Sequence, residues 1–100
     1  MLKLKPDPTF KAVVNIPVPG GDACPVVFEF KHKTRDELAA WLQAPISDDA
    51  EGILSIACGW ELAEPFDAEN VTILVQNYIG CGGVVARRYV EEITKARLGN

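Results

Sequence analysis

The side chains that most often carry chemistry are sparse in this chain of 100 residues. It contains one histidine, His32, and three cysteines, Cys24, Cys58 and Cys81. A catalytic zinc site usually takes three protein ligands, and no short histidine or cysteine motif accompanies His32. The cysteines are too far apart in sequence for a zinc or redox pair, which is typical of a reduced, cytoplasmic protein. The sequence therefore predicts no metal and no cofactor, with His32 at the rim of an apolar sheet face.

The run Gly80-Cys81-Gly82-Gly83 superficially resembles a phosphate-binding loop. A dinucleotide-binding fingerprint would need glycine at position 85, where this chain has Val85, and a strand in front of it. A P-loop would need lysine followed by serine or threonine, and the run has neither. We interpret it as a turn between two helices. No histidine near Cys81 in sequence could activate its thiol, so a catalytic cysteine is not expected.

Clustered charges offer two further candidates, and both have ordinary explanations. The acids Asp48, Asp49 and Glu51 are typical of a helix N-terminus, where they stabilise the helix dipole. Arg87 and Arg88 alternate with acids at helical spacing, which favours a solvated helix face. The net charge of -4 argues against a nucleic-acid partner, because phosphates bind basic surfaces. No catalytic residue is predicted.

Charge is unevenly distributed along the chain. Residues 34–70 carry nine acids and one base, Arg35, whereas the flanking segments 1–33 and 71–100 are each slightly basic. An acidic surface of this kind can steer a basic partner, or simply keep the protein in solution. No run of about 20 apolar residues is present to span a bilayer, and residues 1–6 lack the apolar core of a signal peptide.

The first third of the chain predicts a β-hairpin. Apolar residues alternate on one face at period two: Phe10, Ala12, Val14, Ile16 and Val18, then Val26, Phe28 and Phe30. Between them lies Pro19-Gly20-Gly21-Asp22, in which proline sets the first central φ of a turn and glycine supplies a positive one. Because Pro17 and Pro19 cannot donate to a strand partner, the late part of the first strand should lie at a sheet edge or leave the sheet. Residues 2–5 (LKLK) alternate in the same way and predict a short third strand.

The rest of the chain predicts about four α-helices. Thr34 and Glu37 form a capping box, Ser47 and Asp67 are the expected N-caps of the second and third helices, and Gly59 stops the second. The last helix is expected to close at residues 99–100. The apolar residues expected to face the core are, helix by helix, Leu38, Trp41 and Leu42; Ala50, Ile53, Leu54 and Ala57; Val71, Leu74, Val75 and Tyr78; Ala86, Tyr89, Val90 and Ile93.

Together these elements predict an α+β fold in one domain over residues 1–100, which is long enough for its own core. A hairpin region (1–33) packs against a helical region (34–98). The expected loop between the second and third helices holds the most informative apolar cluster. Trp60, Leu62 and Phe66 lie there among acids, and aromatic residues on a loop are typical of interface hot spots. They can equally cap the core of a small domain; we take them as candidate partner-binding residues.

Five stretches form a recognisable set when they are taken in order. They are residues 5–12 (KPDPTFKA), 30–38 (FKHKTRDEL), 59–62 (GWEL) with 65–66 (PF), 76–78 (QNY) and 96–100 (ARLGN). This set resembles the small tail assembly chaperones of long-tailed bacteriophages and prophages over nearly the whole chain. The sequence departs from the resemblance at residues 79–83 (IGCGG), where a Pro-Gly-Ala-like opening of the last helix would be expected.

The resemblance implies a non-enzymatic role in the cytoplasm of the bacterial host. Such chaperones bind the long, helical tape measure protein, keep it soluble, help tail tube subunits polymerise around it, and are absent from the finished particle. The implied partners are therefore the tape measure protein and the major tail tube protein, with no nucleic acid and no membrane. No residue of the family carries a catalytic role, so none is transferred.

Three other functions remain open at this stage. A small virion or host-interaction module with the same fold would be incorporated stably into particles. A DNA-binding regulator would use the last helix with Arg87 and Arg88 and bind DNA in a salt-dependent way, which the negative net charge argues against. A small enzyme would need a constellation of catalytic side chains, and none is recognisable.

Overall fold

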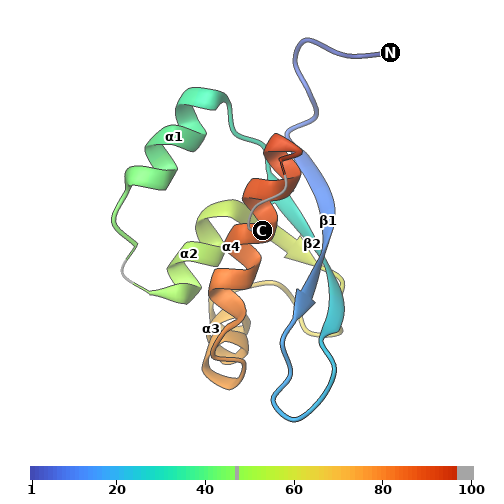
Figure 1. The fold of residues 1–100 in the computed structure, drawn as a ribbon, viewed down its shortest axis with the longest axis vertical. Coiled ribbons are helices and arrows are strands. Elements are labelled where there is room, and N and C mark those ends of the chain that lie inside the picture. Colours follow the sequence, from blue (N-terminus) through green and yellow to red (C-terminus); the bar gives the residue numbers. More distant parts are fainter. Residues whose placement is uncertain (47, 97–100) are drawn as a thin grey trace.

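A computed structural model describes residues 1–46 and 48–96. Within these residues the elements are β1 (Thr9–Ile16), β2 (Cys24–Lys31), α1 (Arg35–Gln43), α2 (Asp49–Ile56), β3 (Ala57–Trp60), α3 (Ala68–Asn77) and α4 (Cys81–Thr94). The strands form an antiparallel sheet of order β1-β2-β3, and the helices gather beside the hairpin (Figure 1). The predicted α+β fold, with its N-terminal hairpin and four helices, is confirmed over the part of the chain that the structure describes.

The predicted hairpin forms, with its alternating apolar residues on one face. Phe10 pairs with Phe30 and Ala12 with Phe28, so the alternating apolar residues of both strands lie on one face, beneath the helices. In the turn the Gly21 amide donates to the Val18 carbonyl at 3.0 Å, and Gly20 has the expected positive φ of 78°. β1 is an edge strand and ends directly before the first of the two prolines, as predicted.

The third strand is not where the sequence predicted it. Residues 2–5 form no strand and are exposed, whereas Ala57–Trp60, expected to be a helix end and the start of a loop, pair with β2. At Ala57 the backbone turns extended (φ -121°, ψ 151°), so α2 stops at Ile56 rather than near Gly59. The physical reason is that the outer edge of β2 needs partners for its amides and carbonyls: the Glu61 amide, for example, donates to Val27 at 2.9 Å.

Two of the predicted helix caps are confirmed and the third shifts. Thr34 and Glu37 make the reciprocal bonds of a capping box, at 3.2 and 2.9 Å. Asp67 accepts from the Asn70 amide at 2.8 Å. The N-cap of α2 is Asp48, whose carboxylate accepts from the Glu51 amide at 2.8 Å. The predicted cap Ser47 lies outside the described residues, as do residues 99–100 at the predicted end of the last helix.

Gly80 lies in the turn between α3 and α4, as predicted, whereas the interpretation as a turn was wrong for Cys81, Gly82 and Gly83, which are helical. α4 begins at Cys81, and Gly82 is buried in its first turn. A Cβ at position 82 would lie 2.5 Å from Cγ of Asp49, so glycine is what allows α2 and α4 to approach this closely. Burial, reinforced by the charge of Asp49, raises the pKa of the Cys81 thiol to about 11. The thiol therefore stays protonated and is a poor nucleophile.

The core centres on Tyr89 of α4. Its ring lies against Phe10, Phe30 and Trp41 at centroid distances of 5.9, 5.2 and 5.6 Å, and its hydroxyl donates to the Lys31 carbonyl at 2.7 Å. Most predicted core residues are buried or half-buried. Leu42 is an exception at 59% exposed, because α1 touches the core only through Leu38 and Trp41.

Candidate functional site

An apolar groove of about 350 Å³ lies between the turn end of the hairpin and α3. Its lining includes Ile16 and Val18 from the hairpin, Trp60 and Leu62 from β3 and the loop after it, and Ile73 and Tyr78 from α3. In Figure 1 this is the lower part of the molecule, where α3 and the hairpin turn both extend. The groove therefore opens at the end of the hairpin opposite to the N-terminus.

The groove exists because α3 carries more apolar surface than the core uses. Val71 faces inward and is fully buried, whereas Ile73 is 52% exposed and faces the groove. The hairpin contributes Val18, which follows the last strand residue and has no strand partner. Side chains of both elements are thus left facing an open space that no other described element fills.

Trp60 is shared between the core and the groove. Its ring lies edge-on to Phe28 at 5.9 Å and to Phe66 at 5.0 Å, and its Nε1 donates to the Glu64 carbonyl at 2.8 Å. These contacts fix the orientation of a side chain that also lines the groove. The two interpretations of Trp60 left open by the sequence, core cap and surface contact, are therefore compatible in this geometry.

The structure brings together two of the three candidate residues. Trp60 and Leu62 both line the groove, whereas Phe66 packs behind Trp60 and does not line it. Ile73 was missed, because it lies outside the predicted inward stripe of α3. The signal was present in the continuous apolar run Ile73-Leu74-Val75, which makes the apolar surface of the helix wider than one core-facing stripe.

One acid lines the groove, and the chain segments that form it are rich in acids. Residues 16–26 and 60–78 contain five acids and no lysine, arginine or histidine. Glu64 lines the groove itself, Asp67 is held at the N-terminus of α3 as its cap, and Glu61 pairs with Lys11 at 3.4 Å. An apolar floor with an acid at its border favours a ligand that offers apolar side chains flanked by cations.

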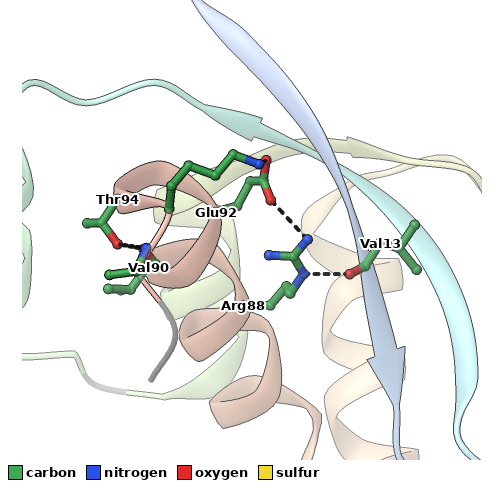
Figure 2. Close-up of polar contacts among 7 residues, drawn as sticks. Val13, Arg88, Val90, Glu92 and Thr94 are labelled. Atoms are coloured by element: carbon green, nitrogen blue, oxygen red, sulfur yellow. Dashed lines mark hydrogen bonds and ion pairs between the residues drawn. The ribbon is translucent and has the colours of Figure 1, made fainter. Parts of the chain in front are cut away.

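The arginines of α4 are engaged in structural contacts. Figure 2 shows Arg88 donating from Nε to the Val13 carbonyl on the open edge of β1 and from Nη2 to Glu92, both at 2.9 Å. Lys95 donates to the other oxygen of Glu92 at 2.6 Å. Arg87 pairs with Glu91 at 3.8 Å. Of these contacts, the one from Arg88 to Val13 holds α4 against β1, and the others join neighbouring turns of α4.

Metal-binding and membrane-spanning features are not found in residues 1–46 and 48–96. No group of three or more histidine, cysteine or acidic side chains could hold a metal ion there. No helix in the same ranges is long and apolar enough to cross a membrane. His32 is half-buried at the end of β2, where its amide donates to the Pro8 carbonyl at 2.8 Å. What the described geometry offers is a surface for binding.

Comparison with known families decides the identity. The sequence model of the family described as "Phage tail assembly chaperone" matches residues 1–100. The chain belongs to this family. Neither the search of curated proteins nor the search of solved structures gives a match.

Membership gives this tail assembly chaperone its role and the class of its partners, which are phage tail proteins. The family that the five sequence stretches resembled is thereby confirmed. The groove beside α3 combines apolar side chains, concavity and an acidic lining residue, which makes it the candidate surface for a partner protein.

Proposed function

We propose that this chaperone binds the tape measure protein through the groove between the hairpin and α3. It acts in the host cytoplasm without catalysing a reaction, keeps its client soluble, and leaves as tail tube subunits polymerise around the client. The observation that carries the proposal is the groove itself, a concave surface lined by the apolar side chains of Trp60, Leu62 and Ile73. An amphipathic helix docks in such a groove through apolar side chains spaced one turn apart.

The size of the groove supports a reversible contact. About 350 Å³ accommodates a few apolar side chains rather than a whole helix, so one copy should bind only modestly. Many copies distributed along one long client would still hold it in solution, because each bound segment raises the local concentration of the next. Modest affinity per site also allows the arriving tail tube subunits to displace the chaperone.

The acid at the border of the groove indicates which segments of the client are bound. Glu64 lines the groove and the segments that form it carry no base, so lysine or arginine should flank the apolar residues of the bound segment. Segments of the client flanked by acids would be repelled. This restricts the groove to a subset of the apolar stretches on a long helical protein.

Co-expression with the tape measure protein tests the proposal. We expect the client to become soluble and to co-purify with the chaperone. Ile73→Ser should abolish co-purification while the fold is retained, because Ile73 is 52% exposed and contributes little to the core. Leu42→Ser, which removes a 59% exposed leucine from α1, is the matched control and should bind normally.

Two results would contradict the proposal. A client that stays insoluble with the wild-type chaperone would show that this pair does not interact. Equal binding by the Ile73 and Leu42 variants would show that the contact lies elsewhere on the surface. Trp60→Ala is a less suitable test, because Trp60 also packs on Phe28 and its loss would weaken the core.

A further inference from the structure

The segment that precedes β1 exposes apolar side chains that its own fold does not cover. Leu2 and Leu4 are 91% and 98% exposed, and Lys3 and Lys5 alternate with them. When such a segment is extended, its leucines point to one side and its lysines to the other. It therefore has the apolar-and-basic character that the groove beside α3 favours.

The match between this segment and the groove has two parts. The leucine side chains suit the apolar floor made by Trp60, Leu62 and Ile73. The lysines suit Glu64, the acid that lines the groove, and the segments that form the groove, residues 16–26 and 60–78, hold no base. Lys3 pairs with Asp7 at 2.8 Å in its own chain, an exposed pair that binding in the groove would replace. Apolar burial and charge attraction thus favour the same placement.

Leu4 of a chain cannot reach the hairpin end of that chain's own groove. Leu4 precedes Thr9 by five residues, which span at most about 18 Å when fully extended. Ile16, at the hairpin end of the groove, lies seven residues from Thr9 in the opposite direction, about 23 Å along the strand. Figure 1 shows the N-terminus and the hairpin turn at opposite ends of the molecule.

We propose that residues 2–5 of one copy of this chain bind in the groove of a second copy. Leu2 and Leu4 insert between the hairpin and α3 of the neighbour, and Lys3 and Lys5 lie near Glu64 at the border of its groove. Segment and groove are different surfaces, so the contact joins unlike parts of two identical chains. The association does not require the tape measure protein.

One consequence rests on the function proposed above. If the groove is also where the client binds, the N-terminal segment of a neighbour covers it until the client displaces that segment. Removing the two leucines would then strengthen client binding while abolishing self-association. If the protein self-associates but does not bind the client, this consequence and the proposed function are both wrong. The proposed contact between copies would still stand.

Light scattering after size exclusion, repeated over a range of concentrations, tests the contact. We expect the mass of the wild-type protein to rise with concentration. The tail variant, Leu2→Ser with Leu4→Ser, and the groove variant, Ile73→Arg, should each raise the dissociation constant by about tenfold or more. A control with Leu42→Ser and Ile79→Ser removes two exposed apolar residues outside the groove and should associate like the wild type.

Mixing the two deficient variants gives the decisive result. The tail variant keeps an intact groove and the groove variant keeps an intact tail, so a mixture should form a complex that neither forms alone. Circular dichroism of each variant confirms that it is folded. A wild type that is monomeric at every concentration, a tail variant that associates normally, or a mixture that stays monomeric would overturn the proposal.

Discussion

The two ends of the hairpin differ in how their apolar residues are covered. At the end near Thr9, Phe10 and Phe30 are enclosed with Trp41 and Tyr89 in one aromatic cluster. At the turn end, Ile16 and Val18 line a groove that stays open beside α3. The same alternation of apolar residues runs through both ends. The pattern thus identifies the face that is apolar, whereas the placement of helices decides whether that face becomes core or binding surface.

The strongest way to test this comparison is to truncate one residue at each end. Tyr89→Ala should lower the free energy of unfolding by about 4 kcal/mol, because it removes a fully buried ring. Ile73→Ala, in the groove, should change it by less than about 0.5 kcal/mol, because the side chain is half-exposed. Urea unfolding measures both.

Tyr89→Phe separates packing from hydrogen bonding at the closed end. It keeps the ring and loses the bond to the Lys31 carbonyl, so we expect a loss of about 1 kcal/mol. Equal losses for Tyr89→Ala and Ile73→Ala would show that the two ends are equally packed, and the comparison would fail.

A second prediction tests how closely α2 and α4 pack against each other. Gly82→Ala should lower the free energy of unfolding by about 1–3 kcal/mol, because the added methyl group would collide with Asp49. Gly83→Ala, with open space around it, should raise it by about 0.5–1 kcal/mol through helix propensity. Asp49→Ala should recover part of the loss in the Gly82→Ala background. Similar effects of the two glycine substitutions would show that α2 and α4 are not closely packed there.

A third prediction concerns the charge of the open end. Glu64→Gln removes the acid that lines the groove, and it should weaken client binding several-fold and reduce its dependence on salt. Asp36→Asn, which removes one exposed acid from the first turn of α1, is the matched control. Titration of a labelled client segment at two salt concentrations measures both effects. Equal weakening by the two variants would indicate a general charge effect rather than a local one.

The smallest expected effect is the pH dependence of the network that holds α4 to β1. The hydrogen bond from Lys95, with that from Arg88, lowers the pKa of Glu92 from its ordinary value of 4.5. Because the folded pKa is the lower one, ionised Glu92 stabilises the fold above pH 4.5, and this contribution is lost as the pH falls through the folded pKa.

The stability difference between wild type and Glu92→Gln should therefore shrink as the pH is lowered from about 6 to 3. Glu91→Gln, which removes the longer 3.8 Å pair with Arg87, serves as the control. A difference that stays constant across this range would show that the charge of Glu92 contributes nothing to stability.

Local sequence signals predicted the fold where the decisive contacts are local. The capping box at Thr34, the cap at Asp67 and the turn around Gly20 depend on residues a few positions apart, and all three formed as expected. β3 was missed because four residues carry too short a pattern, and only the free edge of β2 makes them a strand. The start of α4 was missed because glycine opposes helix formation locally, whereas the contact between Gly82 and Asp49 is long-range.

The candidate site was predicted in part, for a similar reason. Trp60 and Leu62 could be identified because they lie two residues apart, as apolar residues among acids on one expected loop. Ile73 and Val18 join them only in three dimensions, since they come from α3 and from the hairpin turn. A groove between two elements cannot be read from the pattern of either one.

The bond from Arg88 to Val13 has a consequence for how the protein behaves when it is abundant. A sheet that ends in an unpaired strand can recruit further strands and grow into insoluble aggregates. The guanidinium occupies a carbonyl on that strand, and Pro17 blocks its continuation. The molecule can therefore expose an apolar groove beside α3 without the open edge of β1 becoming a template for fibres.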